Sequence, residues 1–341
     1  MEIRKLEPQE HGKTRALYEE VFSEDSRSFV DYYYTEKTRD NQIYVVEEAG
    51  EIQAMLHLNP YTLMVNGSRK AAHYIVAVAT RKEYRGRGYM AALLKQALTD
   101  MYQAGESFTF LMPAAEAIYL PHDFRTVYEQ QRKFCSEEEY RQAPGPASED
   151  PGILVSKAKE EESEELAEAA NGWLGEHFQV YALRDAAYYR RLQKEYASDG
   201  GCLMIEREDG VITGCRTYMP GETGEEKPKI MIRITDLRRM LMSLRLKSLM
   251  AVCFQVTDPI LPENNRCLVL TGTEFSGVML MDGKQENSEG TIPIGALGSF
   301  LFGAKTVEEL AREPGVEMTE RMKQEMEKII PLDKIYLNET V

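Results

Sequence analysis

The sequence has little cysteine, little histidine and no long apolar run. Its five cysteines, an odd number in 341 residues, are too few and too scattered for a disulfide scaffold, and we interpret them as reduced core residues. No Cys-x-x-Cys pair occurs and no two of the five histidines lie four residues apart, so we expect no metal. No stretch approaches about eighteen apolar residues and the first residues lack the apolar run of a signal peptide, which predicts a cytoplasmic protein.

Positive charge is also scarce, since 41 Lys and Arg residues stand against 56 Asp and Glu residues and give a net charge of −15. A surface this negative repels phosphate backbones and anionic membranes, so we expect neither nucleic acid nor membrane as a partner and favour cationic partners. A hydrophobic fraction of 43% beside 28% charged residues is typical of globular proteins, and 341 residues suffice for two or three domains.

The N-terminal part of the chain alternates helical and strand-like patterns. Apolar periodicity predicts helices over 10–22, 28–37 and 88–103, and strands over 42–48, 52–65, 73–80 and 108–112. The strand over 73–80 is apolar on both faces, as expected of a buried central strand. The helix over 88–103 carries a single apolar stripe, which is typical of a helix packed on a sheet.

Two loop-like segments divide the rest of the chain. The stretch 143–152 contains three prolines and two glycines, and 221–228 is similarly polar and irregular. Between them we expect helices and strands of a small α/β unit. Beyond them we expect a helix over 236–244, three strands, three helical segments and an extended tail over 334–337. The Met- and Leu-rich helix over 240–244 fits a core helix better than a ligand-binding surface.

The strongest local signal is the segment 76–98, in which an apolar strand is followed by a glycine turn and an amphipathic helix. Gly86 and Gly88 allow consecutive backbone N–H groups to turn toward a ligand, and the helix that follows points its positive dipole end at the same place. Such a loop can cradle a diphosphate. Four basic side chains lie within seven residues and favour phosphate contacts: Arg81, Lys82, Arg85 and Arg87. The alternative is a plain glycine turn with solvated arginines.

This loop does not match the two common nucleotide-binding motifs. A Walker loop requires Lys and then Ser or Thr after its last glycine, whereas Tyr89 and Met90 follow Gly88. A dinucleotide-binding loop requires a third glycine, and none is present here. The remaining candidate ligand is coenzyme A.

The segment Arg85-Gly86-Arg87-Gly88-Tyr89-Met90 resembles the signature of the GNAT acyltransferase superfamily, except that Met90 replaces a glycine or alanine. The whole chain resembles the enhanced intracellular survival type of N-acetyltransferase. The resemblance implies a mixed α/β (α+β) protein in three units. Residues 1–145 would form a GNAT mixed sheet with flanking helices, 146–228 a second, degenerate GNAT-like unit, and 229–341 a sterol-carrier-protein-like α+β domain.

The resemblance also implies the activity. Acetyl-coenzyme A would serve as cosubstrate, without a metal, and the acetyl group would pass directly to a primary amine of a small molecule or a lysine. Relatives of this type assemble, so we expect a homo-oligomer. The residues implied to bind coenzyme A are Val78, Ala79, Thr80, Arg85, Gly86, Arg87, Gly88 and Tyr89.

Two further positions are implied to be catalytic. The phenol of Tyr119 would act as general acid toward the leaving thiolate, although an arbitrary tyrosine is more often a packing residue. The carboxylate of Val341 would accept the proton of the amine, and Glu116 is the second candidate for that base. The apolar segment 335–337 favours a docked tail over a frayed one. Asp123 stands where the family usually has glycine.

An acceptor pocket for a cationic amine should be acidic, and Glu24, Asp25 and Glu36 could contribute to it, although solvated carboxylates are the simpler interpretation. Two other classes of function stay open at this point. One is a non-catalytic sensor of acyl-coenzyme A, and the other is a lipid carrier with a vestigial transferase domain.

Overall fold

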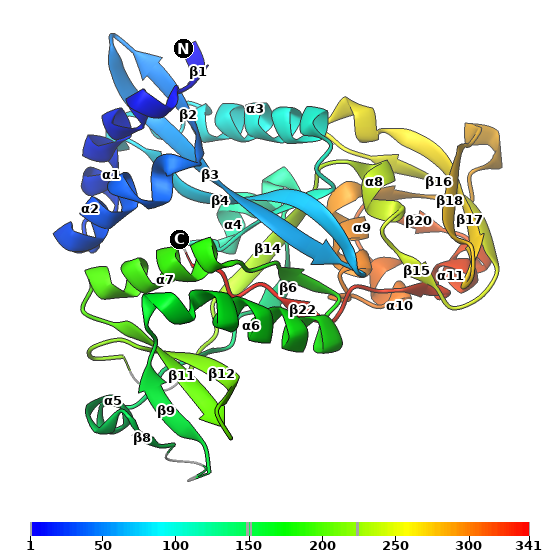
Figure 1. Ribbon diagram of the computed structural model, residues 1–341. Coiled ribbons are helices and arrows are strands. Elements are labelled where there is room, and N and C mark those ends of the chain that lie inside the picture. Colours follow the sequence, from blue (N-terminus) through cyan, green and yellow to red (C-terminus); the bar gives the residue numbers. More distant parts are fainter. Residues whose placement is uncertain (1, 148–149, 151, 223–224, 341) are drawn as a thin grey trace.

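A computed structural model describes residues 2–147, 150, 152–222 and 225–340. The chain is a mixed α/β protein, as predicted. Figure 1 shows an N-terminal sheet with its helices, a middle unit below it and a C-terminal unit beside it. Within the described residues no helix is both long enough and apolar enough to cross a bilayer.

The N-terminal sheet holds the first strands of the chain. Seven strands lie side by side in the order β1 (Glu2–Lys5), β2 (Gln42–Glu48), β3 (Glu51–Val65), β4 (Ser68–Thr80), β5 (Phe108–Leu111), β14 (Lys229–Ile234) and β6 (Arg125–Glu129). Along this path only β4 and β5 are parallel. At the far end of β3 the short strands β10 (Val180–Ala182) and β22 (Ile335–Tyr336) extend the sheet.

Helices cover both faces of this sheet. Met55 of β3 packs with the helices α1 (Arg15–Val21) and α2 (Arg27–Thr35), whereas its neighbour Leu56 packs with α3 (Tyr89–Ala104). This alternation follows from the two-residue period of a strand. The apolar stripe predicted for the third helix is buried at Leu94, Ala97, Leu98 and Met101 and partly buried at Met90. The helix predicted over 10–22 begins instead as a 3₁₀ segment, Pro8–Thr14.

The middle unit has a small sheet of its own. Its strands lie in the order β12 (Val211–Tyr218), β11 (Cys202–Glu208), β9 (Leu154–Lys157) and β8 (Gly145–Pro146). The helix α5 (Glu137–Gln142) lies beside this sheet, and β7 (Arg132–Lys133) pairs with β13 (Glu225–Glu226). The long helices α6 (Ser163–His177) and α7 (Ala186–Ser198) lie between this sheet and the N-terminal one (Figure 1).

The C-terminal unit is built around a third sheet. Its strands lie in the order β18 (Gly277–Asp282), β17 (Arg266–Thr273), β16 (Met250–Thr257), β19 (Gly290–Pro293) and β20 (Glu317–Met318). The remaining elements are α8 (Leu237–Leu241), α9 (Ile294–Leu301), α10 (Val307–Leu310), α11 (Glu320–Met326) and the strand pair β15 (Arg245–Leu246) and β21 (Ile329–Ile330).

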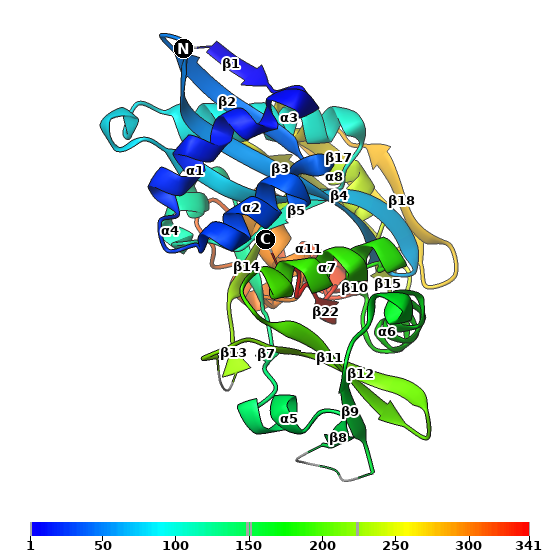
Figure 2. The same cartoon turned by 60° about the vertical axis from the view of Figure 1, so that its left-hand side comes forward.

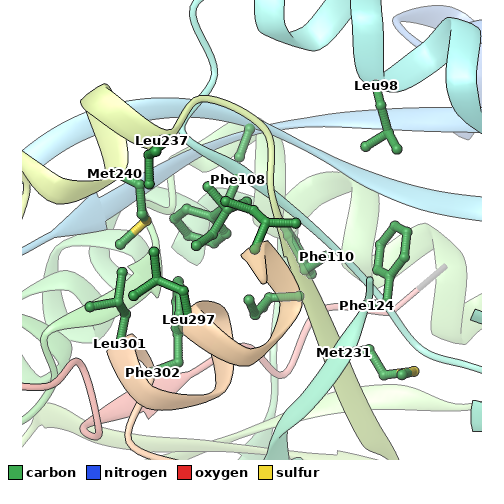
Figure 3. Packing of buried hydrophobic residues seen from close by; sticks show 14 of the residues in the cluster. Leu98, Phe108, Phe110, Phe124, Met231, Leu237, Met240, Leu297, Leu301 and Phe302 are labelled. Carbon is green, nitrogen blue, oxygen red and sulfur yellow. The ribbon is translucent and has the colours of Figure 1, made fainter. Parts of the chain in front are cut away.

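The core is continuous between the N-terminal and C-terminal units. Figure 3 shows Leu297 and Leu301 of α9 among residues of both units. The ring centroids of Phe108, from β5, and Phe302, just after α9, lie 5.0 Å apart. All eight residues of α9 are buried. The two units therefore share one apolar core and are not separate bodies joined by a linker.

Strand β14 crosses the predicted unit boundary. The sequence predicts residues 229–234 in the C-terminal unit, but the strand lies between β5 and β6 of the first sheet. The apolar residues of this strand, Ile230, Met231, Ile232 and Ile234, do not identify the sheet that it joins, because either sheet would bury them. The boundaries at 145 and 228 stay predictions. Residues 148–149, 151 and 223–224 of the two predicted linkers lie outside the described residues.

Candidate functional site

The middle of β4 carries a bulge. Ala79 lies opposite Met55 while Val76 lies opposite His57, so β4 contains one residue more than β3 across this step. Ala77 takes a left-handed backbone angle, φ +48°, at this point. A bulge bends its strand and ends regular pairing. Within the described residues β4 pairs with β5 only at Tyr74 and Ile75, before the bulge, and β5 ends at Leu111. The two parallel strands therefore separate beyond it.

The separation leaves one edge of β4 without a partner strand. The amide of Arg81 donates to the carbonyl of Gln53 on β3, at 2.9 Å. Because successive amides of a strand alternate in direction, the amides of Val78 and Thr80 face away from β3, into the gap beside β5. The amide of Ala79 faces β3. Of the three backbone positions predicted to bind coenzyme A, two are thus directed toward the gap.

The glycine turn lies between this open edge and α3. Gly86 and Gly88 have φ angles of +77° and +81°, in the left-handed region that glycine adopts without strain. A Cβ built on either residue would meet no atom within 4 Å, so the space in front of the turn is open. Helix α3 starts directly afterwards at Tyr89 and runs for 16 residues, so its first amides and its dipole point at the same space. This geometry fits a diphosphate.

The basic side chains around the turn are partly engaged with the protein. Arg85 Nε donates to the Thr80 carbonyl at 3.2 Å. The guanidinium of Arg87 lies 4.6 Å from the centre of the Tyr84 ring, and both arginines remain exposed. Tyr89 is buried and its hydroxyl donates to Glu48, so only its backbone amide is available to a ligand.

A Gly88→Ala variant is expected to weaken coenzyme A binding by about tenfold or more, because a Cβ at left-handed φ strains the turn and occupies the space in front of it. Isothermal titration with coenzyme A measures the effect. Gly210→Ala is the matched control, since Gly210 has φ +85° and equally open surroundings on a distant hairpin. Equal affinities of the two variants would show that the turn does not hold the ligand.

Tyr119 is the last residue of the short helix α4 (Glu116–Tyr119), which follows β5. Its side chain is 7% exposed, and its ring meets Phe124 edge-on with the centroids 5.8 Å apart. Burial raises the pKa of the Tyr119 phenol to about 12, so the group is protonated at neutral pH. Among the described residues none forms a hydrogen bond with its hydroxyl, which leaves the proton available for donation.

The turn after Tyr119 contains a residue in the left-handed backbone conformation that glycine usually adopts. Asp123, which replaces the glycine usual in the resembled family, has φ +62°. Aspartate tolerates this region better than most residues, since its short polar side chain bonds locally. The chain therefore makes the same turn with a different residue.

Glu116, the second candidate for the base, is already engaged. Its carboxylate accepts a hydrogen bond from Thr126 and lies 2.9 Å from Lys229 Nζ. These two contacts lower the pKa of the Glu116 carboxyl. A carboxylate with a lowered pKa is a weaker base, so the structure disfavours Glu116 in that role.

The C-terminal tail is docked between the first sheet and the helices of the middle unit (Figures 1 and 2). Gln130 Nε2 donates to the carbonyls of Leu337, at 2.8 Å, and Glu339, at 3.1 Å. The ammonium group of the buried Lys37 lies 3.3 Å from the Thr340 carbonyl. Val341 lies outside the described residues. The described tail therefore ends inside the protein, beside α2 and α7.

A cavity of about 280 Å³ lies where the tail ends. Thr340 lines it together with Met112, which directly follows β5. Three carboxylates and one guanidinium also line it, namely Glu195, Asp199, Glu222 and Arg132. This acidic cavity lies beside the point where β4 and β5 separate. It is the candidate acceptor pocket, because its carboxylates favour a cationic ligand.

The acidic residues predicted for this pocket lie elsewhere. Glu36 pairs with Lys194 at 2.9 Å and with Arg39 at 3.0 Å, and does not line the cavity. Asp25 accepts a hydrogen bond from Tyr18 at 2.7 Å and lines a different cavity. Glu24 is exposed and lines neither cavity. Of the observed carboxylates, Glu195 lies on α7 and Asp199 directly follows it, and no local pattern in the sequence reveals that α7 packs on α2.

Two family models match the chain. A model described as an acetyltransferase (GNAT) domain matches residues 2–127, and a sterol carrier protein domain matches residues 237–338. The first match spans the separating strands β4 and β5, the glycine turn and Tyr119. Comparison with curated proteins found no match.

Several solved structures share the fold over almost the whole chain. A probable N-acyltransferase from Enterococcus faecalis V583 has a TM-score of 0.77 at 15% identity, covering 98% of this chain and 99% of its own. A GCN5-related N-acetyltransferase from Anabaena variabilis has a TM-score of 0.76 at 14% identity, covering 98% of each chain. Eis1 from Mycobacterium abscessus has a TM-score of 0.70 at 14% identity, covering 99% of each. At such identities the likeness concerns the fold.

Proposed function

Because the chain carries a GNAT acetyltransferase domain followed by a C-terminal sterol carrier protein domain, we propose that it is an N-acetyltransferase that uses acetyl-coenzyme A. The acetyl group would pass to a primary amine by direct attack while both substrates are bound. The observation that carries the proposal is the bulge at Ala77, which opens the edge of β4 just before the glycine turn.

The donor would lie along this edge. The thioester supplies an electrophilic carbonyl carbon, and the Val78 amide, directed into the gap, would polarise the carbonyl oxygen. The amides from Gly86 to Tyr89 would hold the diphosphate, with Arg85 and Arg87 as charged partners. Fixing the donor in this way replaces a bimolecular encounter by attack within one site.

Two proton steps accompany the transfer. As the C–N bond forms and the C–S bond breaks, Tyr119 would donate its proton to the leaving thiolate, which gives the free thiol. The phenolate would regain a proton from the nitrogen that has become the amide. The amine must lose a proton before it attacks, because an ammonium group has no free electron pair. We assign this step to the carboxylate of Val341, one residue beyond the docked Thr340. Lys37 would hold the tail in place through the Thr340 carbonyl.

The acceptor would be a cationic primary amine, either a small molecule or a lysine side chain. The support is the charge of the acceptor cavity, in which the carboxylates of Glu195, Asp199 and Glu222 outnumber the two cations beside them. These cations are Arg132 and Lys37, whose ammonium group lies 3.3 Å from Glu195. Assembly into a homo-oligomer stays a prediction. The test of the function is a screen of primary amines for release of free coenzyme A thiol from acetyl-coenzyme A. We expect release that depends on the amine and is absent from the control without amine. Coenzyme A binding without release for any amine would contradict the proposal.

A further inference from the structure

A further cavity, of about 460 Å³, lies in the middle unit. We refer to it as the α6 hollow, because α6 forms one wall with Leu166, Ala170 and Trp173. The strand β12 forms the opposite wall with residues 212–216. Its volume and mixed lining are those of a small-molecule site.

Small side chains keep the α6 hollow open. Ala169 and Ala170 stand on the helix where larger apolar residues would fill the space. On the opposite wall Cys215 is exposed to solvent. The hollow is therefore accessible to a solute.

The charges that line the hollow are mixed, with Lys133, Arg184 and Arg216 against Asp150 and Glu206. Arg216 is already neutralised by Glu206 and Glu139. Arg184 is less satisfied. Its Nη1 donates to the Tyr189 hydroxyl at 3.0 Å, but its carboxylate partner Glu339 lies 3.8 Å away and no described residue accepts a hydrogen bond from its Nε. A largely buried guanidinium with one unused donor carries an energetic cost that a carboxylate ligand would relieve.

Neighbouring residues hold both the backbone and the guanidinium of Arg184. Asn171 of α6 exchanges two hydrogen bonds with its backbone, at 2.7 Å and 3.0 Å. Its guanidinium lies between the rings of Tyr188, Tyr189 and Tyr336, with distances of 5.2 Å, 5.9 Å and 5.4 Å to their centroids. The cation is thus held at the wall of the hollow by contacts that a bound ligand need not break.

We propose that the α6 hollow binds a small amphipathic anion, with an aliphatic body against α6 and β12 and a carboxylate on Arg184. The apolar body would cover Leu166 and Ile212, which form the buried floor. Tyr336 belongs to the docked tail and Arg184 pairs with Glu339 of the same tail, so the occupant would lie against the segment that leads to the acceptor pocket. The site is independent of the proposed acetyl transfer.

Trp173 provides a direct test, because it is the single tryptophan of the chain and lines the hollow while 48% exposed. Decanoate is titrated below its micellar concentration while Trp173 emission is recorded. We expect a saturable blue shift, since the ligand replaces water around the indole. Decyltrimethylammonium, which has the same chain and the opposite charge, is expected to give no saturable shift.

Two variants test whether decanoate binds in the α6 hollow. Ala170→Leu fills the hollow, and Arg184→Gln removes the cation, so each should weaken decanoate binding by about tenfold or more. Ala304→Leu, at an exposed position of the C-terminal unit, is the matched control and should bind like the parent. An unchanged titration in Ala170→Leu overturns the proposal, as does an equal response to the cationic amphiphile or no saturable change with decanoate. Ala170→Leu leaves the ion pair between Arg184 and Glu339 intact, so it tests the proposal even if Arg184→Gln does not fold.

Discussion

A Tyr119→Phe variant is expected to lose about 100-fold or more in kcat for acetyl transfer while it binds coenzyme A like the parent. The change removes one hydroxyl from a buried ring and keeps the contact with Phe124, so packing is preserved. Without the phenol, the departing thiolate has no donor at this position and its charge is not relieved in the transition state.

The control is Tyr102→Phe, which removes a hydroxyl from a partly buried tyrosine on α3. We expect it to keep the activity of the parent. Stopped-flow or steady-state detection of released thiol measures kcat, and titration calorimetry measures coenzyme A affinity. Turnover of Tyr119→Phe equal to that of Tyr102→Phe would remove Tyr119 from the mechanism.

The pH dependence gives an independent check on Tyr119. Burial raises the pKa of its phenol to about 12, so the proton is lost only as the pH rises toward that value. Between pH 7 and about 10 the phenol stays a donor, and the ratio of parent to Tyr119→Phe activity should be constant. A ratio that falls toward one within this range would show that the donor has a lower pKa and is a different group.

The second large effect is expected in stability. Asp258→Ala should lower the free energy of unfolding by about 3–5 kcal/mol, because it leaves the guanidinium of Arg233 buried without its carboxylate. The side chains of both residues are completely buried and their charged atoms lie 2.6 Å apart. Arg233 lies on β14 and also donates to the His122 carbonyl, in the turn after Tyr119. The pair therefore joins the C-terminal unit to the candidate site.

The matched control for Asp258→Ala is Asp282→Ala. Asp282 pairs with Arg238 at 2.7 Å, but its side chain is 77% exposed, so its loss should cost less than about 1 kcal/mol. Urea denaturation followed by circular dichroism measures both variants. Replacing both partners, as in Arg233→Met with Asp258→Ala, should cost less than Asp258→Ala alone, since no unpaired charge remains. Equal losses for Asp258→Ala and Asp282→Ala would contradict this account.

The local parts of the site could be predicted because their signals are contiguous in the chain. Gly86 and Gly88 fall between an apolar strand and an amphipathic helix, and the structure has that order with both glycines at left-handed φ. The bulge at Ala77 could not be predicted, since alanine has no preference for positive φ. It arises because β3 pairs with β4 on both sides of the extra residue, a constraint from a different strand.

The sequence by itself determined the order of the elements, the glycine turn before α3 and the resemblance to acetyltransferases with a sterol carrier domain, because hydrophobic period, glycine spacing and dipole direction act over a few residues. The tertiary structure decided which sheet takes β14, which helix brings Glu195 and Asp199 to the tail, and where Arg184 stands. These outcomes depend on which apolar surfaces are buried together over the whole chain, and many pairings bury similar area. Only the packing of the complete molecule selects among them.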